Sequence, residues 1–318
     1  MVAGVAQDMT LGIAIAPAAG AVNAVDDVVG QARRAAAAGV RSAWFGQVFS
    51  YDAITLATVA GRAVPEITVG VSVVPIAGRH PLLVASQAQT AQAATGGRFT
   101  LGLGLGAPAF AEPVFGVPND RPIARLREFL TVVRSVFETG TASFEGELIT
   151  AKPPMSAKVA GAEPVPVVVA AMGPQALRVT GELADGTLPL LAGPKALAGH
   201  IVPTIRAAAD TAGRPAPKVI AALPALVTSD LETARRRMAE QTAFYDSIPS
   251  YQRIIELSGA TKAAELAVIG DEELVAAEIR RYFDAGATEV VITQSDLAGT
   301  ADQLRTWRLV GELTRALT

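Results

Sequence analysis

Few polar side chains in this sequence could take part in catalysis, and each follows the end of an apolar segment. Amide, phenol, imidazole and carboxyl groups are present, and the last three can donate a proton to a reacting molecule. Tyr51, His80 and Glu112 are therefore candidate proton donors, and Gln47 is a candidate hydrogen-bonding group. The complete set comprises Gln47, Ser50, Tyr51 and Asp52, then Arg79 and His80, then Glu112, and finally Gln294, Ser295 and Asp296.

Several kinds of catalysis lack the residues that they need. A metal hydrolase requires converging histidines and carboxylates, whereas the chain has only His80 and His200, and His200 falls within a predicted helix. There is no cysteine, which excludes disulfides and thiolate chemistry. No lysine follows a predicted strand, as a Schiff-base enzyme requires, and no G-x-S-x-G motif accompanies a histidine. Any chemistry here therefore depends on an organic cofactor, and no metal site is expected.

The segment RFTLGLGLGAPAF, residues 98–110, places Gly102, Gly104 and Gly106 on alternate positions. A dinucleotide-binding fingerprint that starts at Gly102 needs glycine at position 107, where this chain has Ala107. Successive side chains of a strand point to opposite faces, so the glycines leave one face bare. A bare face accommodates either a neighbouring backbone or a flat ligand, and the segment is compatible with both.

A second segment, VVVAAMGPQALRV, resembles an anion-binding helix start. A buried strand ends at Ala171, Met172 and Gly173 form a turn, and Pro174 opens a helix. The next backbone amides have no partner within the helix and lie at its positive end, where phosphate groups bind. Every strand–helix unit has such a helix start, so the segment by itself is compatible with phosphate or with water.

The apolar segments that end in these polar residues alternate with helical patterns along the whole chain. Most are apolar on both faces, which is typical of parallel strands that helices cover on both sides. Eight such units in a chain of 318 residues predict an α/β fold, a single (β/α)8 TIM-type barrel with insertions at the C-terminal face. The predicted strands cover residues 11–17, 42–46, 67–74, 98–106, 165–171, 187–191, 219–227 and 288–293.

Glycine and capping residues mark the predicted helix boundaries. Helical patterns end on Gly39, Gly97, Gly186 and Gly286, each directly before a β-rich segment, as expected where glycine ends a helix in the left-handed conformation. Helix starts are predicted at Asn23 and Ser229, each with an acidic residue three positions later, and at Pro122 and Pro174. Longer excursions interrupt this alternation at residues 107–121, 139–164 and 240–270.

Composition narrows the class of protein. The chain is 50% hydrophobic and 18% charged, with a net charge of −3 and no long basic cluster, which disfavours a nucleic-acid partner. No uncharged apolar segment is long enough to span a membrane, and no basic flank precedes residues 11–19 as in a signal peptide. We therefore expect a soluble cytoplasmic protein, with a loose tail over residues 1–9 and one domain over residues 10–318.

The ordered set of motifs over residues 67–106 resembles the luciferase-like monooxygenase superfamily. That family has a strand-three segment, then R-H-P, a Q-x-A-T helix and a G-R-x-x-L-G-x-G strand, here ITVGVSVVPIAGRHPLLVASQAQTAQAATGGRFTLGLGLG. The segments SAWFGQVFSYDAITLATVAGR, ELADGTLPLLAGPKALAGHIVPTI and SYQRIIELSGA are similar to the actinobacterial branch that uses the deazaflavin coenzyme F420. The resemblance extends over residues 10–317.

The resemblance implies where a cofactor would bind. The glycine strand flanks the ring system in that family, so Gly104, Gly106 and Ala107 would form a wall beside the ring, with Gln47 at its carbonyl edge. A non-prolyl cis peptide in strand three corresponds to the bond between Ser72 and Val73. The family's phosphate site corresponds to Met172, Gly173, Pro174 and Gln175.

The chain also departs from the family pattern. Several deazaflavin relatives have an acidic residue followed by histidine after strand two, where this chain has Gln47 followed by Val48. Some relatives have a polar pair where this chain has Ala107 and Pro108. The acid–base residues therefore remain open: His80 serves as a helix cap or as a proton donor, and Tyr51 as a proton donor or as packing.

From this resemblance we expect an F420-dependent oxidoreductase. It would transfer a hydride between F420 and a small organic substrate, by reduction of an activated C=C or C=O bond. The alternatives are an FMN-dependent monooxygenase of the same superfamily and a cofactor-binding protein without turnover. An apolar rim predicts a largely apolar substrate, and the family implies a homodimer. The rim comprises Phe110, Pro113, Val114 and Phe115.

Overall fold

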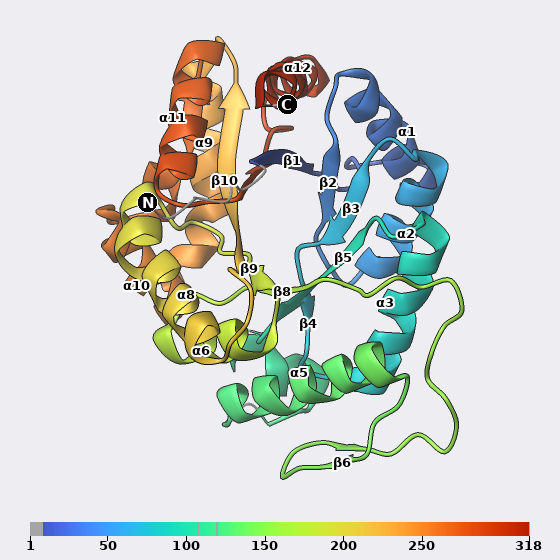
Figure 1. The fold of residues 1–318 in the computed structure, drawn as a ribbon. Coiled ribbons are helices and arrows are strands. Elements are labelled where there is room, and N and C mark those ends of the chain that lie inside the picture. The colour runs from blue at the N-terminus through green and yellow to red at the C-terminus, as the bar shows by residue number, and fades with distance from the viewer. Residues whose placement is uncertain (1–8, 107, 119, 318) are drawn as a thin grey trace, which may run out of the picture.

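Parallel strands form a closed barrel at the centre of the molecule, and helices surround it (Figure 1). This computed structural model describes residues 9–106, 108–118 and 120–317, and the side chains of residues 108–110 are likewise outside the description. The predicted loose tail therefore lies almost entirely outside the described residues. The eight-stranded barrel with helices between strands confirms the predicted TIM-type fold.

The strands of the barrel lie side by side in their order along the chain. β10 pairs with β12, β12 with β1, and the sequence continues through β2, β3, β5 and β8 to β9, which pairs again with β10 and closes the ring. All of these pairings are parallel. The barrel strands are β1 (Thr10–Ala14), β2 (Ser42–Phe45), β3 (Thr68–Val71) with its continuation β4 (Val74–Pro75), β5 (Phe99–Gly104), β8 (Val167–Val169), β9 (Gly186–Thr187), β10 (Lys218–Val227) and β12 (Glu289–Thr293).

Helices connect the strands and pack on the outside of the barrel. The side chain of Asn23 accepts hydrogen bonds from the amides of Val25 and Asp26, which confirms the first predicted cap. The helices are α1 (Ala24–Ala37), α2 (Ala53–Ala63), α3 (Pro81–Thr95), α4 (Pro108–Phe115), α5 (Pro122–Thr139), α6 (Pro174–Leu183), α7 (Pro194–Ala196), η1 (Leu197–Ile201), α8 (Val202–Thr211), α9 (Leu231–Thr242), η2 (Ala243–Ser247), α10 (Pro249–Ser258), η3 (Ala263–Leu266), α11 (Glu272–Asp284) and α12 (Thr300–Leu317).

Two predicted helix boundaries are wrong. The cap of α9 is Asp230 and not Ser229, because the Asp230 carboxylate accepts the amide hydrogen of Thr233. Gly186 does not end a helix in the left-handed conformation but begins β9. A Cβ at Gly186 would lie 2.4 Å from the carbonyl oxygen of Lys218, so glycine is needed there for close strand packing. Gly39, Gly97 and Gly286 do have positive φ values, as predicted.

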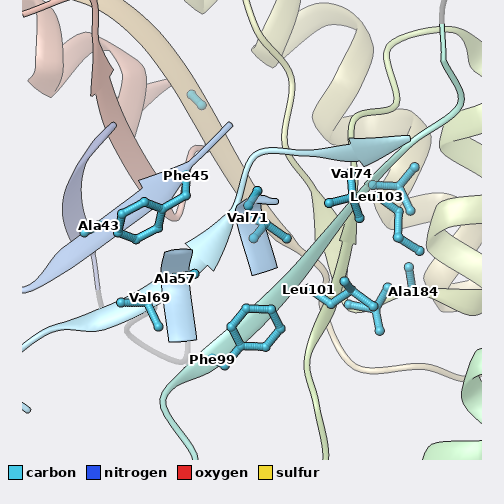
Figure 2. Close-up of a cluster of buried hydrophobic side chains, with 14 of the residues drawn as sticks. Ala43, Phe45, Ala57, Val69, Val71, Val74, Phe99, Leu101, Leu103 and Ala184 are labelled. Atoms are coloured by element: carbon cyan, nitrogen blue, oxygen red, sulfur yellow. The ribbon is translucent and has the colours of Figure 1, made fainter. Parts of the chain in front are cut away.

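Side chains from alternate strand positions fill two separate layers. Phe45, Val71, Phe99 and Leu101 belong to the layer between the strands and the helices, and Figure 2 shows them clustered with neighbours from β2, β3 and β5. The intervening positions point into the barrel, where a smaller cluster surrounds Trp44. Its other members are Val168, Leu188, Ile220, Ala222 and Val291.

The three excursions fold differently from one another. Residues 107–121 include α4, and residues 240–270 include α10 and an unpredicted strand, β11 (Val268–Gly270), which pairs with the end of β10. Residues 139–164 include an antiparallel hairpin of β6 (Phe144–Glu145) and β7 (Thr150–Ala151). The Glu128 carboxylate on α5 accepts hydrogen bonds from the amides of residues 147–149 and thereby holds the hairpin turn.

Candidate active site

The C-terminal opening of the barrel is lined by small or uncharged side chains. Side chains alternate along a strand, so the residue two positions after a buried inward-facing residue also points into the barrel. These positions are half-buried, which places them at the opening, and none carries an ionisable group. They are Ala14, Gly46, Ser72, Ala170, Leu190 and Thr293. Reactive chemistry at this opening therefore requires a bound organic group or residues from the surrounding loops.

The bare face of the glycine strand contacts protein at two of its three positions. A Cβ at Gly102 would lie 1.8 Å from the carbonyl oxygen of Val71, and one at Gly104 would lie 2.7 Å from Cγ2 of Val73. Close approach of the β3–β4 segment therefore explains both glycines. Gly106 has a φ of +79°, and a Cβ there would lie no closer than 3.5 Å to any neighbouring side chain. Ala107 lies outside the described residues.

The peptide bond between Ser72 and Val73 is cis, as the resemblance implies. Both residues are half-buried and lie between β3 and β4 at the opening. A Cβ at Gly46 would lie 3.6 Å from the carbonyl oxygen of Ser72. The residues just after β2 and the β3–β4 segment therefore approach closely. Ser72, Val73 and Gly106 thus surround one part of the opening.

The Gln47 side chain organises the loop between β2 and α2. Its Nε2 donates to the carbonyl oxygens of Val48 (2.5 Å) and Tyr51 (2.7 Å), and its Oε1 accepts the amide hydrogen of Ala53 (3.1 Å). Both amide hydrogens are therefore used within the loop. Only the second lone pair of Oε1 is left for a ligand, which differs from the expected donation to a ring carbonyl.

The other candidate catalytic residues belong to different elements: Tyr51 to the β2–α2 loop, His80 to the start of α3 and Glu112 to α4. His80 caps α3, because its Nδ1 accepts the amide hydrogen of Leu82, and its Nε2 donates to the carbonyl oxygen of Thr150 at 2.9 Å. Tyr51 is half-buried, and burial raises the pKa of its phenol, so it stays protonated at neutral pH. Glu112 is exposed on α4. Within the described part of the chain, the side chains of these candidates are not hydrogen-bonded to one another.

The predicted anion site is the exposed start of α6. Gly173 is the N-cap and Pro174 the first helical residue, and the first backbone bond of the helix runs from the Leu177 amide to the Gly173 carbonyl. The amides of Gln175 and Ala176 precede that bond and lie at the positive end of the helix. Apart from Gly173 and the residues on either side of it, no described heavy atom lies within 4 Å of the Cβ position at Gly173, so the space there is open.

Two residues near the opening, His200 and Leu191, were not among the predicted candidates, and a third, Gln294, was predicted only as a polar residue at a strand end. Nε2 of His200 lies 2.8 Å from the carbonyl oxygen of Met172, which directly precedes the α6 cap. Leu191 and Gln294, just after the strands that end at the opening, have φ values of +59° and +54°. Such values are uncommon outside glycine and cluster at functional sites. The only sequence signal was the histidine itself, whose position inside a helix argued against a functional role.

Apolar side chains cover the rim above the opening. Phe49 is 77% exposed and Phe115 is 38% exposed, and their ring centroids are 6.1 Å apart. Val114 and Pro113 are exposed on α4 beside them, whereas the side chain of Phe110 is outside the description. The β2–α2 loop and α4 therefore share an apolar surface, in agreement with the expected apolar rim.

A cavity of about 790 Å³ lies elsewhere, between α9, the end of α10, η3, β11 and α11. None of the candidate site residues lines it. Its lining is made of apolar side chains together with the charged residues Arg235, Lys262, Glu265, Glu278 and Arg281. A buried cluster of Leu191, Ile255 and Ala263 packs next to Leu190, which faces the barrel. Since no strand end presents its polar residues to this cavity, we place the candidate active site at the opening.

The described residues contain neither a metal cluster nor a membrane span. No group of three or more His, Cys, Asp or Glu side chains in that part of the chain is arranged to hold a metal ion. No helix there combines the length and the hydropathy that crossing a bilayer requires.

Comparisons with known proteins identify relatives over most of the chain. The sequence model of luciferase-like monooxygenases matches residues 8–307. An uncharacterized protein of Mycobacterium tuberculosis is 29% identical over 224 residues, which cover 66% of either chain, so the match spans just under two thirds of that relative. The 5,10-methylenetetrahydromethanopterin reductase of Methanopyrus kandleri is 25% identical over 297 residues, 80% of this chain and 84% of the reductase.

Solved structures share the fold over nearly the whole length. An F420-dependent secondary alcohol dehydrogenase, in complex with an F420–acetone adduct, has a TM-score of 0.80 at 19% identity and covers 98% of this chain and 99% of its own. A type II Baeyer–Villiger monooxygenase from Pseudomonas putida, in complex with FMN, has a TM-score of 0.75 at 17% identity. The match covers 96% of this chain and 97% of the monooxygenase. Of these two structures, one holds F420 and the other holds FMN.

Proposed function

Since the chain belongs to the luciferase-like monooxygenase family, we propose that it is an oxidoreductase that uses the deazaflavin coenzyme F420. It transfers a hydride between F420 and a small, largely apolar organic substrate, reducing an activated C=C or C=O bond. Two similar proteins support this choice: the F420-dependent secondary alcohol dehydrogenase and the reductase of Methanopyrus kandleri, whose solved structure is described as coenzyme F420-dependent.

The observation that carries the proposal is the uncharged lining of the barrel opening. Ala14, Gly46, Ser72 and Ala170 leave room beside the strands, and no ionisable side chain occupies an inward-facing position there. The open space at Gly173 beside the free amides of α6 suits a phosphate group. The residues present therefore fit a planar, phosphate-bearing cofactor.

The residues of the chain would bind and orient the cofactor, and the cofactor would carry the chemistry. When bound, the deazaflavin supplies the hydride. Gln47 holds the β2–α2 loop in place, Phe49 and Phe115 limit the access of water, and Gln175 and Ala176 offer backbone amides to the phosphate. Tyr51 is half-buried in the β2–α2 loop, and its phenol is protonated at neutral pH, so we assign it as the proton donor.

FMN-dependent oxygen insertion is the second candidate function. Its support is the structural similarity to an FMN-binding Baeyer–Villiger monooxygenase, and the α6 site fits the phosphate of FMN equally well. A third candidate, cofactor binding without turnover, is favoured by the shortage of acid and base groups at the strand ends.

We further propose that the protein is a cytoplasmic homodimer with no nucleic-acid partner. Exposed apolar side chains on α2 and α3, Val59 and Leu83, are suited to a contact between copies, and the net charge of −3 disfavours nucleic acid. Light scattering coupled to gel filtration gives the oligomeric state directly, and a monomer at micromolar concentration would contradict the dimer.

The decisive experiment is a paired titration of the apoprotein with F420 and FMN, followed by cofactor fluorescence. Tight F420 binding with weak FMN binding, then oxidation of reduced F420 by a panel of apolar enones and ketones, would support the proposal. Tight FMN binding with oxygen consumption would support the monooxygenase instead. Tight F420 binding without turnover on any substrate would favour cofactor binding alone, and no binding of either cofactor would overturn all three.

A further inference from the structure

The imidazole of His200 reaches from one helical segment to the loop that precedes another. Its Nε2 lies 2.8 Å from the carbonyl oxygen of Met172. A carbonyl oxygen only accepts hydrogen bonds, so Nε2 carries the hydrogen and donates it. The ring is half-buried, and the next residue after Met172 is Gly173, the cap of α6. His200 therefore fixes the backbone one residue before the predicted anion site.

A wide helical turn presents His200 to this loop. Residues Leu197–Ile201 form a π-helical turn between α7 and α8, closed by the bond from the Val202 amide to the Leu197 carbonyl. Such a turn inserts one residue into a helix and is frequent at functional sites. On the far side of His200, Thr204 Oγ1 donates to the His200 carbonyl at 2.6 Å, which holds the start of α8.

The helix that carries His200 is fixed against α6 itself. A Cβ at Gly181 of α6 would lie 2.6 Å from the carbonyl oxygen of Ile205 and 2.8 Å from Cβ of Ala208, so α6 and α8 pack with their backbones close together. Because α8 packs on α6, the distance between His200 and the start of α6 is constrained. The hydrogen bond to Met172 transmits this constraint to the loop.

We infer that His200 is a positioning residue that holds the Met172–Gln175 loop in the conformation that binds the cofactor phosphate. This inference rests on the proposed cofactor site and adds a residue to it. His200 acts on the phosphate through the Met172 carbonyl and needs no contact with the cofactor.

Three variants separate this role from a merely structural one. His200→Leu removes the donor, His200→Gln keeps an N–H group at a similar reach, and Thr204→Val removes a neighbouring hydrogen bond of the same helix without touching the loop. We expect His200→Leu to weaken F420 binding about fivefold to tenfold, the value of one lost hydrogen bond. His200→Gln should recover most of the affinity, and Thr204→Val should bind as the wild type does.

The measurements are the dissociation constants of F420 and of inorganic phosphate for each apoprotein, together with its melting temperature. Each of His200→Leu and Thr204→Val loses one hydrogen bond and should melt slightly lower, so loss of affinity in His200→Leu but not in Thr204→Val supports the inference. Equal losses in His200→Leu and Thr204→Val, or unchanged affinity in His200→Leu, overturn it.

Failure of the proposed function has a different signature. If wild-type protein binds phosphate but not F420, the cofactor assignment fails, and the same three variants still test the loop through phosphate binding. If wild-type protein binds neither F420 nor phosphate, there is no anion site for His200 to position, and the inference is overturned as well.

Discussion

The indole nitrogen of Trp44 donates a hydrogen bond to Oε1 of Glu289 across 2.8 Å inside the barrel. Ser42 Oγ donates to the same oxygen at 2.7 Å. Trp44 fits there because Gly70 leaves space: a Cβ at Gly70 would lie 2.5 Å from Cζ3 of the indole. Burial raises the pKa of Glu289, and the hydrogen bonds from Ser42 and Trp44 oppose this rise only in part.

Replacement of Glu289 by glutamine should remove a pH dependence of stability. Because the native pKa is above the unfolded one, the native state binds the proton more tightly. Its free energy of unfolding therefore falls as the pH rises between the two values, by about 1.4 kcal/mol for each pH unit between them, and then levels off. Glu289→Gln does not titrate, so urea unfolding at a series of pH values should show that this variant gains stability relative to wild type as the pH rises above 4.5.

A matched control is Glu289→Leu. It leaves the Trp44 and Ser42 donors without their acceptor oxygen, and it does not titrate either, so it should be less stable than Glu289→Gln by about 1–3 kcal/mol at every pH. If the unfolding free energies of wild type and Glu289→Gln change with pH in parallel, the pKa of Glu289 is not raised.

Gly104→Ala should crowd the opening through Val73. The new Cβ would lie 2.7 Å from Cγ2 of Val73, and overpacking of this kind costs about 1–3 kcal/mol. Because Val73 is half-exposed at the opening, we also expect weaker cofactor binding. Adding Val73→Ala should recover both properties, and a double-mutant cycle of unfolding free energies and cofactor dissociation constants measures the coupling. Strictly additive effects would show that the two residues do not interact.

Gly173→Asp should change stability and binding in opposite directions. Aspartate is a better helix cap than glycine by a few tenths of a kcal/mol, so the apoprotein should melt at the same temperature or slightly higher. The new carboxylate competes for the α6 amides and repels phosphate, so cofactor affinity should fall more than about tenfold. Gly173→Ala adds an uncharged group in open space and is the control. Undiminished affinity in Gly173→Asp would place the phosphate elsewhere.

His80→Asn tests whether His80 is structural. Asparagine is a strong helix cap, so the start of α3 should persist while the bond to the Thr150 carbonyl is lost. We expect a lower melting temperature and turnover within about twofold of wild type, since one neutral hydrogen bond contributes about 1 kcal/mol. Loss of turnover at an unchanged melting temperature would instead identify His80 as catalytic.

Most of the barrel could be predicted because its signals are local. The apolar segments, the helix cap at Asn23 and the left-handed glycines at Gly39 and Gly286 depend on neighbouring residues only. The missed elements depend on distant partners: β11 forms by pairing with the end of β10, and the hairpin turn is held by Glu128. The misplaced cap at Ser229 has a different cause, because the adjacent Asp230 offers a competing acceptor one residue later.

The candidate site was harder to predict than the fold. The start of α6 carries its own signature in Gly173 and Pro174, and the structure places it as an exposed helix end. The role of Gln47 could not be predicted, because its amide is used by three backbone groups that only the folded loop brings together.

The sequence by itself determined the type and order of the strands and helices, because hydrophobic periodicity and capping act over a few residues. Only the tertiary structure decided which groups meet. Closure of the barrel joins Trp44 to Glu289 across 245 residues of sequence, and the packing of α8 on α6 joins His200 to Met172 across 28. The physical reason is that a side-chain hydrogen bond depends on distance and direction in space, which closure and helix packing set and local preference does not.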